Sequence, residues 1–220
     1  SVATVDHGLR PEAAAEAKMV AEICALLNVP HTVLPWVGWD ARGNLQDEAR
    51  KERYRLLAQW GRAQGLDLVA LGHTADDMAE TFVMRLGRRA GVDGLAAIAP
   101  QFERNQMRWA RPLLSSRRTE LQEYLAARKV TWVNDPSNDD DKYTRVRVRK
   151  ALAVLSELGV DSMALADVAE NLKSARDALA HHMLMTARQI AICQTGAVSV
   201  DEQAFQTLPS ETKRRLVCHA

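Results

Sequence analysis

The chain has 220 residues, a net charge of +1, 47% hydrophobic residues and 26% charged residues. This balance is typical of a soluble globular protein with one large domain, or a large domain and a smaller one. The three cysteines, Cys24, Cys193 and Cys218, form no C-x-x-C pair, which argues against zinc, an iron–sulfur cluster or a disulfide framework and fits a reduced cytoplasm. No apolar run approaches the roughly 18 residues that span a membrane, and the first residues do not resemble a signal peptide.

The first part of the chain alternates between strand and helix patterns. Strands are predicted over residues 1–5, 31–36 and 66–71, and helices over 11–27, 44–65 and 75–88. Pro11 stands at the start of the first helix, and Asn44 is a suitable N-cap for the second. The order β-α-β-α-β-α predicts a parallel sheet that helices cover on both faces.

The pattern loosens after Gly91 and then becomes helical. We expect a turn at 91–94, a strand within 107–114, a helix from Ser115 or Ser116 to about 128, a short strand at 131–134 and a loop at 135–138. Helices are expected over 149–158, 162 to about 193 and 208 to the end, with a brief strand at 198–200. We place a domain boundary within 146–159, which gives domains of 1–148 and 149–220.

Polar residues gather between the third strand and the third helix, in the run Gly72-His73-Thr74-Ala75-Asp76-Asp77. In open α/β sheets the carboxyl ends of the strands form the ligand crevice. Backbone N–H groups at a helix N-terminus favour anions, whereas two carboxylates there suit a cation, an amine or Mg2+. Capping of the helix by one of these side chains is the plain alternative. A cap needs one such residue, and this run carries four, so we favour a site.

Seven segments, taken together, carry a resemblance to a known family. They are Val5-Asp6-His7-Gly8-Leu9-Arg10, Gly43-Asn44-Leu45-Gln46, Ala49-Arg50 with Arg53-Tyr54, the run at 72–77, Gly91-Val92-Asp93-Gly94-Leu95, Arg111-Pro112-Leu113-Leu114 and Asp135-Pro136-Ser137-Asn138. In order and spacing they resemble the tRNA(Ile)-lysidine synthetase family of PP-loop (N-type) ATP pyrophosphatases. The resemblance implies an α/β fold: a parallel-sheet, adenine-nucleotide alpha hydrolase-like (Rossmann-like) domain, followed by a smaller, mostly helical, tRNA-binding domain.

The resemblance also implies a ligase reaction. ATP activates the C2 oxygen of the wobble cytidine of an isoleucine tRNA and releases pyrophosphate; the ε-amine of free lysine then attacks C2, and AMP leaves. Mg2+, backbone N–H groups and cationic side chains must offset the polyphosphate charge. The amine must be held close and unprotonated when it attacks.

The resemblance assigns roles to residues at the strand ends and on the helices. It implies ATP binding by Asp6, His7, Arg53 and His73, catalysis by Arg53, His73 and Asp77, and lysine binding by Asp77 and Glu80. Asp77 and Glu80 are three residues apart and share a helix face, and His73 can approach Asp77. Asp76 points about 100° away from Asp77 and is a candidate cap or metal ligand.

Plainer structural roles compete with these assignments. Charged neighbours around Arg53 are typical of a solvated helix face, and His73 could be a hydrogen-bonded histidine at a strand end. For Asp6-His7, a turn after an interior strand is equally favoured.

Contact with tRNA is predicted for Arg111, Arg145, Arg147 and Arg149. The last three belong to a basic stretch, since Lys142 and Lys150 flank them, and clustered cations can track phosphates. A second group, Arg85, Arg88 and Arg89, ends a helix and could simply complement its dipole.

One departure from the family is large. Its phosphate-binding loop, Ser-Gly-Gly-x-Asp-Ser, is not found, and Ser1 begins too late to contain it. We therefore expect a fragment of a longer enzyme that is inactive alone. The alternatives are another PP-loop tRNA modifier of the thiolase type, or a non-catalytic RNA- or nucleotide-binding relative. We expect a cytoplasmic protein with no membrane partner. A homodimer is possible from the sequence.

Overall fold

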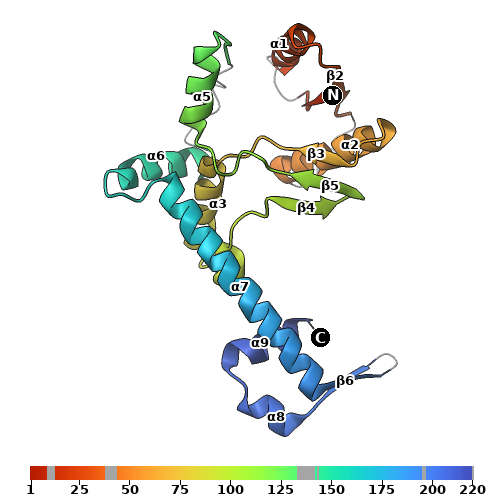
Figure 1. Ribbon diagram of the computed structural model, residues 1–220, viewed down its shortest axis with the longest axis vertical. Coiled ribbons are helices and arrows are strands. Elements are labelled where there is room, and N and C mark those ends of the chain that lie inside the picture. The colour runs from red at the N-terminus through yellow and green to blue at the C-terminus, as the bar shows by residue number, and fades with distance from the viewer. Residues whose placement is uncertain (9–12, 38–43, 133–141, 143, 195–196, 220) are drawn as a thin grey trace. The chain divides into compact units, whose positions relative to one another are not determined.

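The computed structural model describes residues 1–8, 13–37, 44–132, 142, 144–194 and 197–219. The chain divides into two compact units (Figure 1): unit 1 comprises Ser1–Thr74 and Ala99–Asn138, and unit 2 comprises Ala75–Ile98 and Asp139–Ala220. These units are defined by packing within each of them. The predicted domain boundary after residue 148 therefore stays a prediction. The motif at 135–138 lies outside the described residues.

Unit 1 contains the alternating strands and helices. Its elements are β1 (Val2–Asp6), α1 (Ala13–Leu26), β2 (His31–Pro35), α2 (Leu45–Ala63), β3 (Leu68–Ala70), β4 (Gln101–Arg104), β5 (Met107–Ala110) and α5 (Arg118–Ala127). The N-cap prediction at the start of α2 is confirmed, because Asn44 Oδ1 accepts hydrogen bonds from the backbone N–H groups of Gln46 at 3.0 Å and Asp47 at 3.4 Å. The strand expected at 131–134 does not begin within its two described residues.

The predicted parallel pairing is confirmed, but the described strands of unit 1 form two sheets where one continuous sheet was expected. β1 pairs in parallel with β2, from Val2 opposite His31 to Asp6 opposite Pro35. β3 pairs in parallel with β5, and β5 pairs antiparallel with β4. The strand β4 was not predicted from the sequence. Its turn to β5 has two residues of positive φ, Asn105 and Gln106, and lacks the glycine that usually marks such hairpins.

Both sheets of unit 1 share one core with α2. Its buried members are Tyr54, Leu57, Ala58, Val69, Met107 and Trp109. Trp109 is fully buried, stacks on Phe102 with ring centroids 6.0 Å apart, and donates its indole N–H to the Arg104 carbonyl at 3.0 Å. Val5 and Leu71, from the two sheets, pack against this same core. The segments that follow β1 and β3 therefore start beside one core.

Unit 2 is mostly helical, and its part after residue 148 agrees with the mostly helical region predicted there. Its elements are α3 (Ala75–Gly87), α4 (Val92–Leu95), α6 (Thr144–Ser156), α7 (Ser162–Ile190), β6 (Ala191–Gln194), β7 (Ala197–Val200), α8 (Glu202–Thr207) and α9 (Ser210–His219). The turn expected at 91–94 is a short helix, α4. The long helix ends at Ile190 rather than near Cys193, because residues 191–194 pair antiparallel with β7. No described helix is long and apolar enough to cross a membrane.

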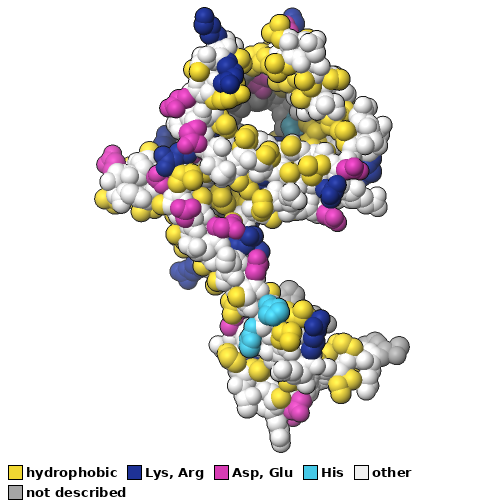
Figure 2. Space-filling model, viewed as in Figure 1, with side chains coloured by type: hydrophobic (Ala, Val, Ile, Leu, Met, Phe, Trp, Pro, Cys, Tyr) yellow, Lys and Arg dark blue, Asp and Glu magenta, His cyan; other side chains and the backbone are white. Residues whose placement is uncertain are grey.

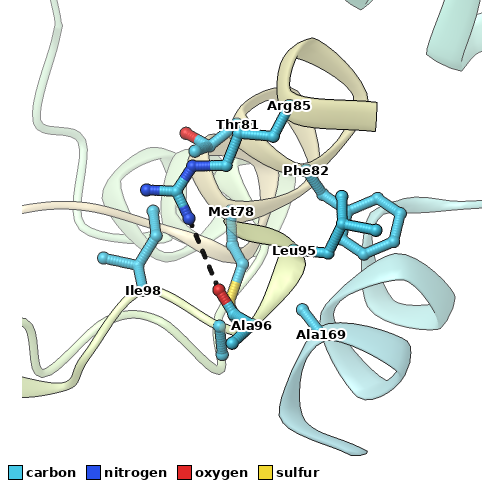
Figure 3. Close-up of a pocket in the computed structure, with 9 residues that line it drawn as sticks. Met78, Thr81, Phe82, Arg85, Leu95, Ala96, Ile98 and Ala169 are labelled. Carbon is cyan, nitrogen blue, oxygen red and sulfur yellow. Dashed lines mark hydrogen bonds between the residues drawn. The ribbon is translucent and has the colours of Figure 1, made fainter. Parts of the chain in front are cut away.

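The helices α3, α4 and α7 pack around a small, mainly apolar depression (Figure 3). Met78 and Phe82 of α3 line it with Leu95 of α4 and Ala169 of α7. The guanidinium of Arg85 closes one side by donating to the Gly94 carbonyl at 2.8 Å. This arginine therefore has a structural partner within unit 2.

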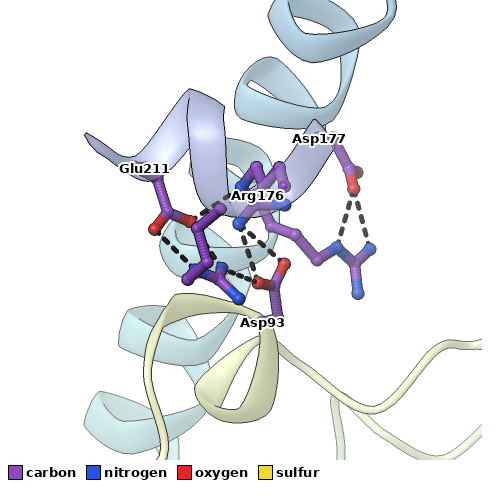
Figure 4. Close-up of polar contacts among 6 residues, drawn as sticks. Asp93, Arg176, Asp177 and Glu211 are labelled. Carbon is purple, nitrogen blue, oxygen red and sulfur yellow. Dashed lines mark hydrogen bonds and ion pairs between the residues drawn. The ribbon is translucent and has the colours of Figure 1, made fainter. Parts of the chain in front are cut away.

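A cluster of charged residues fastens α9 to α4 (Figure 4). Arg215 donates to both carboxylate oxygens of Asp93 at 2.8 Å and to Glu211 at 2.8 Å. Arg214 donates to the same two carboxylates, at 3.2 Å and 2.7 Å. The Arg215 side chain is 5% exposed, whereas that of Arg214 is 53% exposed.

Candidate active site

The carboxyl end of β1 carries the first group of predicted site residues. Asp6 is the last residue of the strand, and its Oδ1 accepts a hydrogen bond from the backbone N–H of Gly8 at 2.8 Å. Gly8 has φ of 60°, which glycine adopts without a Cβ clash. The Asp6 side chain thus closes a tight turn that holds His7 at the strand end.

His7 is half-buried beside an aromatic ring and a cation. Its imidazole meets the indole of Trp36 edge-on, with centroids 5.5 Å apart. Burial lowers the pKa of His7, and the nearby positive charge of Arg53 lowers that pKa further. The structure therefore brings together three of the four predicted ATP ligands, Asp6, His7 and Arg53. It favours the neutral imidazole of His7 at neutral pH. The contact of His7 with Trp36 was not predicted from the sequence.

Arg53 lies on the exposed flank of α2, next to the buried Tyr54. The neighbouring Glu52 and Arg55 form their own ion pair, which lowers the pKa of Glu52. The helix face around Arg53 is charged, as expected if Arg53 only belongs to a solvated helix face. Arg53 is nevertheless close enough to His7 to lower the pKa of the imidazole. A guanidinium beside a neutral imidazole suits an anion such as a phosphate.

The predicted polar run follows β3 as expected. Leu71 donates its N–H to the Ala110 carbonyl at 2.8 Å, which continues the pairing with β5 past the last residue of β3. His73 is half-buried, Thr74 is buried, and α3 begins at Ala75. Within unit 1, His73 therefore follows a strand that packs on the same core as β1.

The acidic residues of the run, Asp76 and Asp77, lie in the first turn of α3 in unit 2. Asp76 Oδ1 accepts a hydrogen bond from Ser162 Oγ at 3.2 Å, at the start of α7. Asp77 is half-buried, and its carbonyl accepts from Thr81 Oγ1 at 2.8 Å. Asp76 thus joins α3 to α7. Within the described residues no group of three His, Cys, Asp or Glu side chains could hold a metal ion, so a protein-only cage around Asp76 does not fit.

Glu80 is the most deeply buried charged residue of the candidate site. Its side chain is 1% exposed, and its Oε1 accepts a hydrogen bond from Arg149 Nε of α6 at 2.5 Å. Arg145 and Arg147, on the same helix, are exposed, while Val146 and Val148, which alternate with the arginines, are buried. The three arginines that the sequence grouped together therefore have two different surroundings.

Arg111 is buried where β5 ends, which its basic character alone did not indicate. Its guanidinium donates to the Ala99 carbonyl at 2.6 Å and lies 4.1 Å from the centroid of the Phe102 ring. These contacts hold the strand end in place and favour a structural role. Contact of Arg111 with tRNA stays a prediction.

Comparison with known proteins decides the family. Residues 1–156 match the model of a PP-loop domain, so the match contains every predicted site residue from Asp6 to Arg149. The chain belongs to the PP-loop family. This membership confirms the predicted nucleotide-binding α/β fold, and it places both the turn after β1 and the run after β3 in the PP-loop domain.

Several curated relatives align with nearly the whole chain. A tRNA(Ile)-lysidine synthase of Ruegeria pomeroyi is 48% identical over 99% of this chain and 52% of its own length. Proteins of the same name from Rhodopseudomonas palustris and Zymomonas mobilis are 39% and 38% identical, each over 99% of this chain and 63% and 66% of their own lengths. The chain therefore spans about half to two thirds of the relatives it matches.

A solved structure shares the fold. The U34-tRNA thiolase NcsA from Methanococcus maripaludis, described with its [4Fe-4S] cluster, superposes with a TM-score of 0.65 over 79% of this chain and 62% of that chain. Sequence identity is 15%, so the likeness concerns the fold alone.

Proposed function

We propose that this chain forms the catalytic part of a tRNA(Ile)-lysidine synthase. The observation that carries the proposal is the 48% identity, over 99% of the chain, to the Ruegeria pomeroyi protein of that name. The proposed reaction adenylates the C2 oxygen of the wobble cytidine with ATP, releases pyrophosphate, and joins the ε-nitrogen of lysine to C2 as AMP leaves. A tRNA-modifying enzyme of this kind would work in the cytoplasm.

ATP is proposed to bind at the strand ends of unit 1. The Arg53 cation beside a neutral His7 supports an interaction with phosphate oxygens, because the imidazole can hydrogen-bond while the guanidinium supplies the charge. His73, which follows β3, is proposed to complete this group. Mg2+ is proposed to arrive as the ATP complex, since it is often held by substrate phosphates with one or two carboxylates.

Lysine is proposed to bind near Asp77 and Glu80. These residues are three apart on α3 and share a face, so both carboxylates can approach one amine. Glu80 supports this role because its Oε2 is buried and accepts no hydrogen bond from the described residues. A buried carboxylate oxygen of this kind is a strong acceptor for an N–H group.

The isoleucine tRNA is proposed to contact α6 through Arg145 and Arg147. Both side chains are exposed, whereas Val146 and Val148 on the same helix are buried. Across the visible face of the molecule, basic and acidic side chains are interspersed (Figure 2). Phosphate contact is proposed for the exposed Arg145 and Arg147.

A direct assay tests the proposal in the full-length protein. Labelled lysine, ATP and an isoleucine tRNA transcript should give labelled tRNA, with one pyrophosphate and one AMP formed for each lysine attached. His73→Ala should abolish attachment, whereas Arg62→Ala, on the opposite end of α2 from the candidate site, should not. Absence of label with the unaltered protein would overturn the proposal. Entry of sulfur instead of lysine would support the thiolase alternative; the thiolase NcsA has a similar fold.

A further inference from the structure

The ion pair between Glu80 and Arg149 has an asymmetric geometry. Arg149 Nε lies 2.5 Å from Glu80 Oε1, while Oε2 of the same carboxylate is buried and accepts no hydrogen bond from the described residues. Glu80 is 1% exposed and Arg149 is 29% exposed. One carboxylate oxygen is thus occupied, and the second is available to a further donor.

Arg149 differs in its surroundings from the arginines near it. Arg147 is exposed, and its guanidinium donates to Thr144 Oγ1 of its own helix at 3.2 Å. Arg149 instead reaches across to α3 and ends on a buried acid, 69 residues away in sequence. A guanidinium engaged in this way is poorly placed to neutralise a phosphate on the surface.

We propose that Arg149 is a positioning residue for the amine site: it holds Glu80 through Oε1 and leaves Oε2 to accept a hydrogen bond from the substrate amine. This inference rests on the proposed function and concerns the lysine-binding step within it. It assigns to Arg149 a role different from the tRNA contact predicted from its basic neighbours.

The chemistry of the amine explains why such a pair is useful. A lone buried carboxylate would stabilise the ammonium form of lysine, which has no lone pair to attack C2. A carboxylate already paired with a guanidinium is neutral overall, so it can orient the amine with less preference for the ammonium form. Because Arg149 belongs to α6, the pair also links the proposed tRNA-binding helix to the amine site on α3.

The test separates the two chemical steps in the full-length protein. ATP-dependent pyrophosphate release on tRNA, measured without lysine, reports adenylation; lysine attachment reports the second step. Arg149→Met should raise the KM for lysine about tenfold or more, as expected for a lost hydrogen bond to a charged group, and should leave adenylation within about twofold. Arg149→Lys should recover most of the lysine affinity. Arg147→Met should raise the KM for tRNA instead.

A double variant distinguishes positioning from simple support of the fold. Removing one partner of a buried ion pair leaves an uncompensated charge, so Arg149→Met alone can destabilise unit 2. Glu80→Gln/Arg149→Met removes both charges and should regain thermal stability while its lysine affinity stays low. If the double variant binds lysine like the unaltered protein, or if Arg149→Met changes the KM for lysine by less than about twofold, the inference is wrong. If the unaltered protein attaches no lysine at all, the proposed function fails instead.

Discussion

Two neighbouring arginines of α9 contact the same two carboxylates but differ in burial, and we predict different effects of removing them. Arg215→Met removes three hydrogen bonds to charged oxygens, each at 2.8 Å, from a side chain that is 5% exposed. Hydrogen bonds to charged groups contribute about 1.5–3 kcal/mol each. The carboxylates of Asp93 and Glu211 stay partly exposed and keep Arg214 as a partner, so we expect the variant to lose about 2 kcal/mol of stability in α9. Arg214→Met, at an exposed position, should have little effect.

Native-state hydrogen exchange of the α9 amides in the full-length protein measures this difference. A loss of about 2 kcal/mol corresponds to about 30-fold faster exchange over residues 210–219 in Arg215→Met. The matched variant Arg214→Met should exchange like the unaltered protein. Equal acceleration in both variants would refute the argument, because burial would then not decide the strength of these contacts.

Three further predictions concern the site and the helix ends. In an NMR titration, Arg53→Met should raise the pKa of His7, since the Arg53 charge lowers it, whereas Arg62→Met on the same helix should leave it unchanged. Arg214 and Arg215 lower the pKa of Glu211 to about 2, so the contribution of Glu211 to the stability of α9 should be complete above its ordinary pKa of 4.5. That contribution should be lost as the pH falls from 4.5 towards 2, and hydrogen exchange of α9 at stepped pH would detect the loss. Asn44→Ala should lower the free energy of unfolding by about 1 kcal/mol in urea, and an unchanged midpoint would show that the cap contributes nothing.

Local chemistry made much of unit 1 predictable. The Asn44 cap depends on a side chain and backbone groups two and three residues away, so the sequence alone contains the interaction. The alternation of strands and helices followed from apolar spacing in the same way. β4 escaped prediction because its hairpin turn uses Asn105 and Gln106 at positive φ, which sequence patterns assign mainly to glycine.

The end of α7 was harder to predict because its residues fit two periodicities. Ile190, Ile192 and Cys193 continue the apolar pattern of the helix, but they also suit a strand. Pairing of residues 191–194 with 197–200 decides between the two, and that pairing forms only in the folded chain.

The partners of the site residues could not be predicted, because they come from distant parts of the chain. Asp76 and Ser162 are 86 residues apart, and Glu80 and Arg149 are 69 apart. Composition grouped Arg149 with Arg147 as surface cations, whereas packing of α6 on α3 turns Arg149 towards a buried acid. The contact of Arg111 with Phe102 could not be predicted either, because it also depends on how the chain folds.

Mass spectrometry of the tRNA product tests the central claim most directly. The full-length protein is incubated with ATP, lysine and an isoleucine tRNA transcript, and the tRNA is then digested to nucleosides. We predict that the wobble cytidine gains the mass of one lysine less one water, and that no gain occurs without ATP. An unmodified cytidine, or one that has exchanged oxygen for sulfur, would contradict the account.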